Sequence, residues 1–376
     1  MKQKIAIYTL TSELHDERAV DAVTKEFLGS IGMEYELKGS DYADYGEYYL
    51  SMIYVRTGGT EGIFKRLLPT LQQRSSRPFY LLTSGKSNSL AASMEILAYL
   101  NQHGIKGEII HGSAEYIAKR IQLLASIEDA QRKIYGIRLG IIGKPSDWLI
   151  ASHADKEKVK EQLGIELIDI PMQELLDTIA KKGDIYDALK DIIGKYQLQG
   201  FTLRCFDLLT TVKDTGCMPL ARLNAEGFVA GCEGDVPAML SMMIVRSLTE
   251  VSGFQANPAS INPETGELLF AHCTIPLDMV ERYELDTHFE SGIGVGIRGF
   301  MKEGPITIFK VSGDLSRRFI AEGYLMENQS KPDLCRTQQL IRLSDKNQAA
   351  YFLTNPIGNH HIIMPGHLKE LLESIF

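Results

Sequence analysis

The sequence lacks several features that would assign it to a common class of protein. It has no run of about 18 apolar residues, the length that a membrane-spanning helix needs, and its N-terminal apolar stretch is too short and too interrupted for a signal peptide. Its five cysteines are odd in number and no two are spaced as CxxC, which argues against a disulfide framework and against zinc-finger spacing. These absences predict a cytoplasmic protein with reduced thiols.

The chain also lacks an excess of positive charge. The 40 Lys and Arg residues are outnumbered by 48 Asp and Glu residues, which gives a net charge of −8. Because phosphate binding requires a basic surface, this balance predicts no nucleic-acid partner. The chain has 376 residues, 44% of them hydrophobic and 23% charged, values typical of a globular protein. At this length we expect two or three domains.

Alternating strand and helix patterns predict an α/β fold that begins with two Rossmann-like or flavodoxin-like domains. We place the first at residues 1–135 and the second at 136–255. Within the second, Gly200–Leu209 has the composition of a buried strand, and the very apolar Val236–Thr249 predicts a helix whose methionines fill the core.

The remaining chain, residues 256–376, changes to short β-rich stretches separated by Gly and Pro. This texture predicts a β-rich C-terminal domain built as an antiparallel, barrel-like sheet. Ala349–Thr354 and His361–Met364 are two of the predicted strands, and His367–Phe376 is predicted to form a closing helix.

Two glycine-rich segments have the composition of ligand-binding loops, and only the first has a suitable context. Thr57, Gly58, Gly59 and Thr60 stand where a strand ends and a helix begins, so their backbone N–H groups could bind an anion or a sugar hydroxyl. Equally, Thr60 could be a plain N-cap and the glycines could serve a tight turn. Gly294–Gly299 matches G-x-G-x-x-G, but no helix pattern follows, so we interpret it as a glycine-rich strand and not as a dinucleotide site.

Glu233 is the strongest single candidate for a functional residue. It follows the apolar run GFVAGC and precedes the apolar helix that Asp235 would cap. α/β sheets place their chemistry at the carboxyl ends of strands, and the flanking Gly231 and Gly234 allow a ligand to approach the backbone. A surface acid beside an N-cap is the structural alternative.

Histidines stand beside three further apolar or extended segments. His272 ends the run LLFAHC, His288 and Glu290 share one face of an extended segment by their two-residue spacing, and His360 and His361 precede a strand. A lone strand histidine is more often a structural residue than a ligand, so none of them alone indicates a site. Combined with Glu233, they suit a divalent ion of the manganese, iron or zinc type.

Four motifs in this order resemble the L-fucose isomerase family, and most closely its shorter members, with L-arabinose isomerase as a more distant relative. They are Gly231–Leu240 (GCEGDVPAML), Phe270–Pro276 (FAHCTIP), Thr287–Gly299 (THFESGIGVGIRG) and Gly358–His361 (GNHH).

The resemblance implies a metal-dependent aldose–ketose isomerase that uses Mn²⁺ or a similar ion and works through an ene-diol. It implies that Glu233 is both metal ligand and proton-transferring group. It further implies that His361, with His360 as the alternative, and His272 are ligands. Sites in this family form between subunits, so a homo-oligomer, a trimer or hexamer, is also implied, with a monosaccharide as substrate.

One position departs from the family pattern. An aspartate is expected about two dozen residues after the first glutamate, but the chain has Asn257 there. An amide oxygen can contact a metal or a sugar, but it cannot shuttle a proton. Either Glu290 or Asp235 then supplies the second acid/base group, or the activity differs from that of the fucose enzymes.

Further residues receive substrate-binding roles by the same resemblance. His288, Glu290 and Arg298 are expected to orient sugar hydroxyls or an anionic substituent, and Thr57–Thr60 are expected to bind the far end of the sugar. The departure at Asn257 also motivates an alternative, a non-catalytic sugar-binding or regulatory protein on the same fold.

Overall fold

The computed structural model describes residues 2–375, and the chain divides after Asp129 into two compact units. Phe376, the last residue of the predicted closing helix, lies outside the described residues. The predicted α/β class with parallel sheets and an antiparallel barrel is confirmed. The domain boundaries predicted at 135 and 255 stay predictions, since the second unit holds both a parallel sheet and the barrel.

The first unit is built on a parallel sheet of five strands in the order β2-β1-β3-β4-β5, one of the common doubly wound orders. The strands are β1 (Lys2–Leu10), β2 (Glu36–Gly39), β3 (Tyr48–Val55), β4 (Phe79–Leu82) and β5 (Gly107–Ile110). The helices between them are α1 (Glu17–Ile31), α2 (Glu61–Arg74), α3 (Ser89–Gln102) and α4 (Ala114–Ile134), which continues past the division, with a 3₁₀ turn η1 (Lys86–Asn88) before α3.

The second unit begins with a parallel sheet of four strands in the order β7-β6-β8-β9. Its strands are β6 (Arg138–Ile142), β7 (Glu166–Ile170), β8 (Gly200–Leu203) and β9 (Val229–Cys232). Its helices are α5 (Lys156–Leu163), α6 (Met172–Lys182), α7 (Ile185–Tyr196), α8 (Phe206–Thr211), α9 (Cys217–Ala225) and α10 (Val236–Thr249).

The rest of the second unit is a closed barrel of six strands in the order β10-β11-β16-β15-β14-β17. These strands are β10 (Phe254–Asn262), β11 (Glu267–His272), β14 (Gly304–Val311), β15 (Arg318–Gln329), β16 (Thr337–Leu343) and β17 (His361–Pro365). The additional elements are the hairpin β12 (Arg282–Asp286) and β13 (Gly296–Phe300), the 3₁₀ turns η2 (Leu277–Met279) and η3 (Lys346–Gln348), and the helices α11 (Ala349–Thr354) and α12 (Lys369–Ser374).

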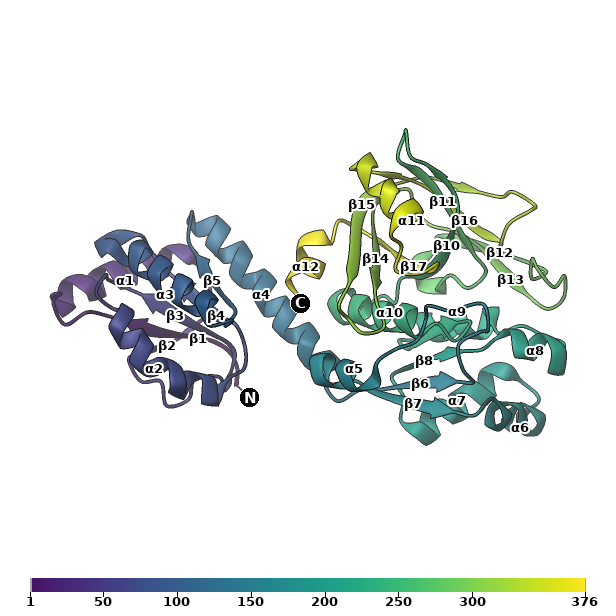
Figure 1. The fold of residues 1–376 in the computed structure, drawn as a ribbon, viewed down its shortest axis with the longest axis horizontal. Helices are drawn as coiled ribbons and strands as arrows, with labels where there is room; N and C mark the ends of the chain where they lie inside the picture. The colour runs from purple at the N-terminus through teal and green to yellow at the C-terminus, as the bar shows by residue number, and fades with distance from the viewer. Residues whose placement is uncertain (1, 376) are drawn as a thin grey trace. The chain divides into compact units, whose positions relative to one another are not determined.

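Helix α10 joins the two halves of the second unit. Figure 1 shows it between the barrel and the four-stranded sheet, and it contacts β8 and β9 on one side and β14 and β17 on the other. A helix covered on both sides must be apolar all round, and its residues are almost all buried, Met239, Met242 and Met243 included. The prediction that these methionines fill the core is confirmed, as is Asp235 as the N-cap, which accepts from the Ala238 N–H.

Two predicted strands are wrong in part or whole. The strand predicted at Gly200–Leu209 ends at Leu203 because its neighbours β6 and β9 offer no ladder partners beyond Ile142 and Cys232, and the chain turns into α8. Ala349–Thr354 is a helix, since Asp345 accepts from the Asn347 N–H and starts the helical turn that leads into it.

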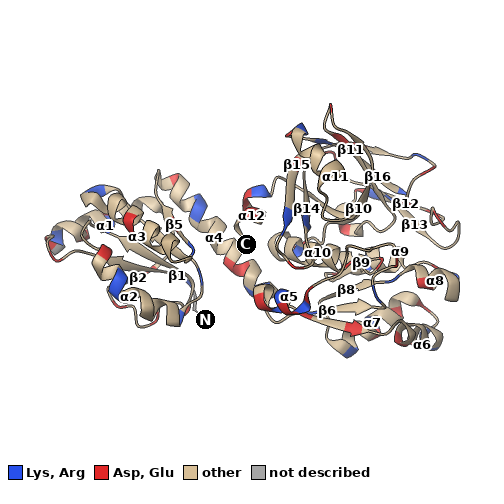
Figure 2. Ribbon diagram, viewed as in Figure 1, with Lys and Arg blue, Asp and Glu red and all other residues tan. Residues whose placement is uncertain are grey.

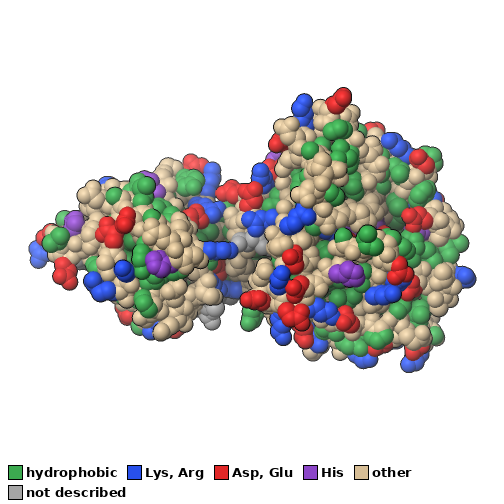
Figure 3. Space-filling view, in the orientation of Figure 1, with side chains coloured by type: hydrophobic (Ala, Val, Ile, Leu, Met, Phe, Trp, Pro, Cys, Tyr) green, Lys and Arg blue, Asp and Glu red, His purple; other side chains and the backbone are tan. Residues whose placement is uncertain are grey.

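Charge is distributed without a single dominant sign on the face in view. Figure 2 shows acidic and basic residues on helices and connections of both units, while the sheet interiors carry few charges, and Figure 3 shows both signs interleaved on the visible surface. Along residues 2–375, no helix has the length and apolarity that crossing a membrane requires.

Candidate active site

Glu233 stands in the tight turn between β9 and α10, at the carboxyl end of the four-stranded sheet. It is 8% exposed, and its φ of 62° is a left-handed conformation that non-glycine residues avoid. Gly234 follows at φ 72°, where an added Cβ would lie 2.5 Å from the Lys144 carbonyl oxygen. The Ser146 N–H donates to the Glu233 carbonyl, so the loop after β6 holds this turn from outside. Backbone strain of this kind concentrates at functional sites.

Three side chains converge above this turn. Glu233 Oε1 lies 3.4 Å from His272 Nε2 at the end of β11 and 3.5 Å from His360 Nε2 just before β17. One ligand atom from each residue lies within 4.8 Å of the other two, and all three residues are buried. Neighbouring ligands of one ion, each about 2.0–2.3 Å from it, are roughly 3–3.5 Å apart, so the two Glu–His distances suit a shared ion.

The far nitrogen of each histidine is fixed by a neighbour. His360 Nδ1 donates to Asp235 Oδ2 at 2.9 Å, and His272 Nδ1 lies 3.0 Å from the Thr274 hydroxyl. The Asp235 carboxylate requires a proton on Nδ1 of His360, whereas the Thr274 hydroxyl can donate to Nδ1 of His272 or accept from it. In both residues Nε2 faces the cluster, the arrangement that metal-binding histidines adopt.

Asp235 is itself held by a second buried charge. The Lys310 ammonium, on β14 and fully buried, lies 3.4 Å from both carboxylate oxygens. Burial alone would raise the pKa of Asp235, but Lys310 and His360 hold it well below its usual range. Burial lowers the pKa of Lys310 against this pull. These partners favour the ionised form of Asp235, and its carboxylate oxygens are held by Lys310, His360 and the Ala238 N–H.

The charges in the cluster support one another. Burial opposes the charge on Glu233, but His360 and His272 outweigh it and keep the pKa of the carboxyl well below its usual range. Burial likewise opposes the charge on His360, but Glu233 and Asp235 raise its pKa to about 9. In the absence of an ion a proton on His360 thus balances the carboxylates, and this is the position that a cation can take.

Two buried polar atoms near this point have no hydrogen-bond partner among the described residues, His360 Nε2 and Asn257 Oδ1. His360 Nε2 is too far from Glu233 Oε1 for a good hydrogen bond. Asn257 is on β10, two residues beyond Gln255, whose side-chain amide bonds to the backbone N–H and C=O of Cys232, next to Glu233. Alternation along the strand puts Asn257 on the same face. When His360 loses the proton on Nε2, this nitrogen and the Asn257 Oδ1 oxygen both offer a lone pair, which suits a metal ion.

His361 lies in a different environment from its neighbour. Its Nε2 is 3.0 Å from the Tyr351 hydroxyl, its Nδ1 is 3.1 Å from the Asn359 carbonyl oxygen, and its ring packs against Phe270 and Phe352. Burial, then the charge of Lys310, lowers its pKa to about 3. The structure thus brings His360, the alternative in the expectation, to Glu233, and places the preferred His361 among aromatic rings of the barrel.

Of the other residues expected to contact the substrate, the structure places His288 beside the site, while Arg298 is paired within its own hairpin. His288 is buried beside the site. Burial lowers its pKa, and the charge of the exposed Glu290 offsets this only in part. Its Nδ1 is 3.0 Å from the Ser291 hydroxyl. Arg298 Nη2 donates instead to Asp286 Oδ2 at 3.1 Å, on the neighbouring strand of its hairpin.

The expected Thr57–Thr60 loop belongs to the first unit. Thr57 Oγ1 accepts from the Ser12 N–H, and the Thr60 hydroxyl donates to the Thr57 carbonyl. Thr60 starts α2 without a side-chain cap bond. Gly58 N–H donates to Ser87 O, so this loop adjoins the one after β4. The threonine hydroxyls thus serve the loop itself, and a sugar-binding role for this segment stays a prediction.

Sequence reasoning missed two residues of the site. Lys310 lies in an ordinary β-rich run, and only its burial against Asp235 marks it. Trp148 lies in the loop after β6, where its indole N–H donates to Glu233 Oε2 at 2.7 Å. A tryptophan in a polar loop, WLIAS after KPSD, is the one signal that could have singled it out.

Two cysteines adjoin the cluster. Cys232 and Cys273 precede Glu233 and follow His272, and both are buried. Cys232 Sγ lies 2.9 Å from Cys205 Sγ. The hydrogen bond from Cys335 lowers the pKa of Cys273 to about 6. Both are therefore buried neighbours of the cluster in sequence.

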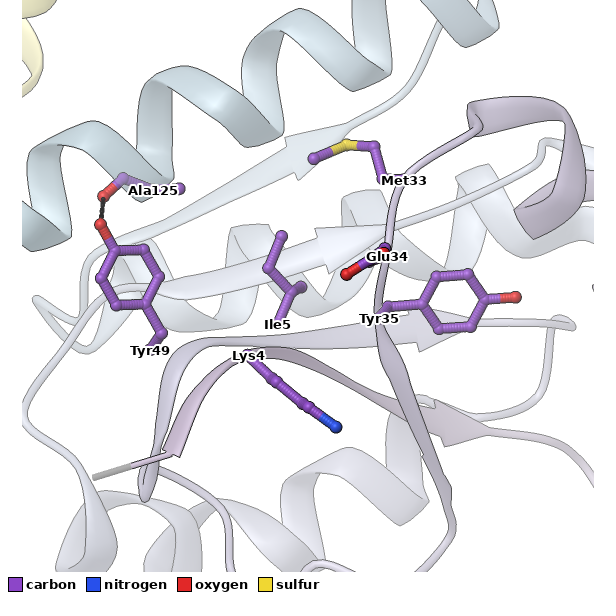
Figure 4. Close-up of a pocket in the computed structure, with 7 residues that line it drawn as sticks. All are labelled: Lys4, Ile5, Met33, Glu34, Tyr35, Tyr49 and Ala125. Atoms are coloured by element: carbon purple, nitrogen blue, oxygen red, sulfur yellow. Dashed lines mark hydrogen bonds between the residues drawn. The ribbon is translucent and has the colours of Figure 1, made fainter.

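A cavity of about 480 Å³ lies in the first unit, beside β1 and α4. Figure 4 shows its lining residues, which include Lys4, Glu34 and Tyr49. The Tyr49 hydroxyl already donates to the Ala125 carbonyl. The cavity holds no convergent set of ligands comparable with Glu233 and its histidines in the second unit.

Comparison with known proteins indicates a class of reaction. No family model matches the chain. Two proteins named sulfoquinovose isomerase, from Priestia aryabhattai and Priestia megaterium (strain ATCC 12872 / QMB1551), are each 22% identical over 262 residues, which are 60% of this chain and 59% of theirs. A third of the same name, from Clostridium sp. (strain MSTE9), is 29% identical over 161 residues, 42% of this chain and 33% of its own.

The chain is similar to sugar isomerases. The expected resemblance is confirmed at that level, while the relatives carry the name sulfoquinovose isomerase and not L-fucose isomerase. The match spans about three fifths of the length of the Priestia proteins, with 59% of each covered.

The turn that presents Glu233 yields a stability prediction. We expect Gly234→Ala to lower the free energy of unfolding of the second unit by about 2–5 kcal/mol, because a left-handed non-glycine residue costs about 1–3 kcal/mol and the Cβ also collides with the Lys144 carbonyl. Denaturant unfolding measures it.

The matched control is Gly194→Ala in α7, where an added Cβ meets nothing within 4 Å. This change is expected to be neutral or to stabilise the protein by about 0.5–1 kcal/mol. Equal stability of the two variants would show that Gly234 is not required for the turn.

Proposed function

We propose that the protein is a metal-dependent aldose–ketose isomerase. The observation that carries the proposal is the convergence of Glu233, His272 and His360 on one buried point at the carboxyl end of a parallel sheet. The similarity to proteins named sulfoquinovose isomerase supports the same reaction class. One carboxylate and two imidazoles are a donor set for manganese, iron or zinc, with Asn257 as a further oxygen donor.

The proposed proton transfer begins with Glu233. Its carboxylate takes the proton from C2 of the open-chain aldose and returns it to C1, so that the substrate passes through an ene-diol. A bound divalent ion would polarise the sugar oxygens and stabilise the developing negative charge. The ketose also requires a proton to move from O2 to O1, and we assign this transfer to the exposed Glu290 or to its neighbour His288.

We propose a sulfonated monosaccharide as the substrate. The relatives carry sulfoquinovose in their names. Near His288, Arg298 and Arg336 share one carboxylate, that of Asp286, with N–O distances of 3.1 and 3.5 Å. A guanidinium group binds a sulfonate as it binds a carboxylate, so these two arginines could exchange Asp286 for an anionic substituent of the sugar. We further propose a homo-oligomer in which Thr57–Thr60 of one subunit approaches the sugar of its neighbour.

The test is an isomerase assay on sulfoquinovose and on unsulfonated aldoses, with Mn²⁺ added and after chelation. The proposal expects turnover that requires the ion and that is faster with the sulfonated sugar. Turnover with unsulfonated sugars alone would contradict the substrate class, and undiminished turnover after chelation would contradict metal dependence.

A non-catalytic sugar-binding protein is the second candidate, and Asn257 favours it because an amide cannot carry a proton. The two are separated by elemental analysis together with a sugar-binding measurement. A metal-free protein that binds sugars without turnover favours the binder.

A further inference from the structure

Trp148 is the only tryptophan of the chain. It lies in the loop between β6 and α5, and it combines a contact to the site with a large exposed surface. Its indole N–H donates to Glu233 Oε2 at 2.7 Å, yet its side chain is 52% exposed. The ring is half in water, and its polar atom reaches a buried carboxylate. Trp148 therefore stands between the solvent and the site.

The loop that carries Trp148 is fastened on both sides of it. Before it, the Ser146 N–H donates to the Glu233 carbonyl, and Arg204 bonds both Pro145 O and the Asp147 carboxylate. After it, Leu149 is 4% exposed and anchors the loop in the core. The position of the indole is therefore determined by the surrounding structure.

The two carboxylate oxygens of Glu233 have different partners. Oε1 faces Nε2 of His272 and of His360, while Oε2 accepts from Trp148. An indole N–H can only donate, so it holds Oε2 as an acceptor and fixes the plane of the carboxylate. Without it, the carboxylate could rotate and bring either oxygen to the histidines.

The exposed ring of Trp148 is the first of three packed rings, those of Trp148, Phe206 and His288, which we call the aromatic wall. Trp148 meets Phe206 edge-to-face at 4.9 Å between ring centres, and Phe206 meets His288 in the same way at 5.7 Å. Sugar-sized ligands bind where apolar and aromatic surface surrounds a few polar groups. Here the wall runs from Glu233 to the histidine proposed to contact the sugar.

We propose that Trp148 is the positioning residue of this site. It orients Glu233 through Oε2 and offers its exposed ring as the surface on which the less polar face of the sugar rests. The proposal rests on the proposed function for its second half, whereas the orientation of Glu233 is independent of turnover.

Two substitutions separate the two roles. Trp148→Phe keeps an aromatic ring and removes the N–H, so kcat should fall about 10–100-fold, as when other partners that orient metal ligands are lost, with little change in KM. Trp148→Ala removes the ring as well and should raise KM in addition. Phe206→Leu is the matched control, which alters the wall and leaves the N–H in place, and should change KM more than kcat. Wild-type kcat in Trp148→Phe would overturn the positioning role.

A second measurement needs no activity. Because the chain has one tryptophan, an ¹⁵N-labelled sample gives a single indole N–H resonance. Glu233→Gln should shift this resonance, and so should titration with Zn²⁺ and then with sugar. An unmoved resonance in Glu233→Gln would overturn the contact itself. If the wild type turns over no sugar but the resonance responds to Glu233→Gln and Zn²⁺, the isomerase proposal fails while the positioning of Glu233 stands.

Discussion

Glu233→Gln is expected to abolish most isomerase activity while the protein stays folded. The substitution keeps the size of the side chain and removes its charge, so the variant has no base for the C2 proton. Loss of one acid/base group typically costs a factor of about 10²–10⁴ in rate. The amide also carries two donors in a position where Oε1 faces His272 and His360 and Oε2 accepts from Trp148. If the amide oxygen accepts from Trp148, the NH₂ group faces the histidines, where it cannot coordinate a cation, so the bound metal should decrease too.

Steady-state kinetics with Mn²⁺ and elemental analysis measure the two effects. Glu264→Gln is the matched control, because this glutamate lies exposed in the turn between β10 and β11 of the same barrel. It should retain wild-type turnover and metal content. Wild-type turnover in Glu233→Gln would remove this residue from the mechanism, and unchanged metal content would remove it from the ligands.

The sequence predicted most of the fold because local patterns follow the elements closely. The very apolar run Val236–Thr249 located α10 at both ends, and alternating strand and helix patterns indicated the two parallel sheets. The failures are instructive in physical terms. β10 was not recognised because Asn257 and Pro258 interrupt its pattern, and the strand irregularity beside Pro258 accommodates them. Ala349–Thr354 has a strand-like composition, yet a capped turn at Asp345 directs it into a helix, which local composition does not record.

The candidate site was predictable only in part. Glu233 and His272 were identified because each ends an apolar strand, a local property. The choice between His360 and His361 depends on which neighbour turns toward Glu233, and that is determined by Asp235 and by the aromatic rings that surround His361. Trp148 and Lys310 act on residues 85 and 75 positions away, so no local pattern could reveal them.

The buried pair of Asp235 and Lys310 gives the second large expected effect. Asp235→Asn should lower the free energy of unfolding of the second unit by about 3–5 kcal/mol, because it leaves the fully buried Lys310 ammonium without its counter-charge. Asparagine caps helices about as well as aspartate, so loss of the α10 cap contributes little. Denaturant unfolding followed by Trp148 fluorescence measures this value in the second unit.

The double variant Asp235→Asn with Lys310→Met separates stability from function. Both charges are then absent and the methionine fills the apolar part of the lysine position, so most of the lost stability should return. Divalent metal affinity should not return. His360 Nδ1 would face a neutral amide instead of a carboxylate, and loss of such a partner typically costs about 10–100-fold in affinity or activity. If the double variant regained wild-type metal affinity together with stability, Asp235 would serve only to neutralise Lys310, and the orientation of His360 would have to come from the loop before β17 alone.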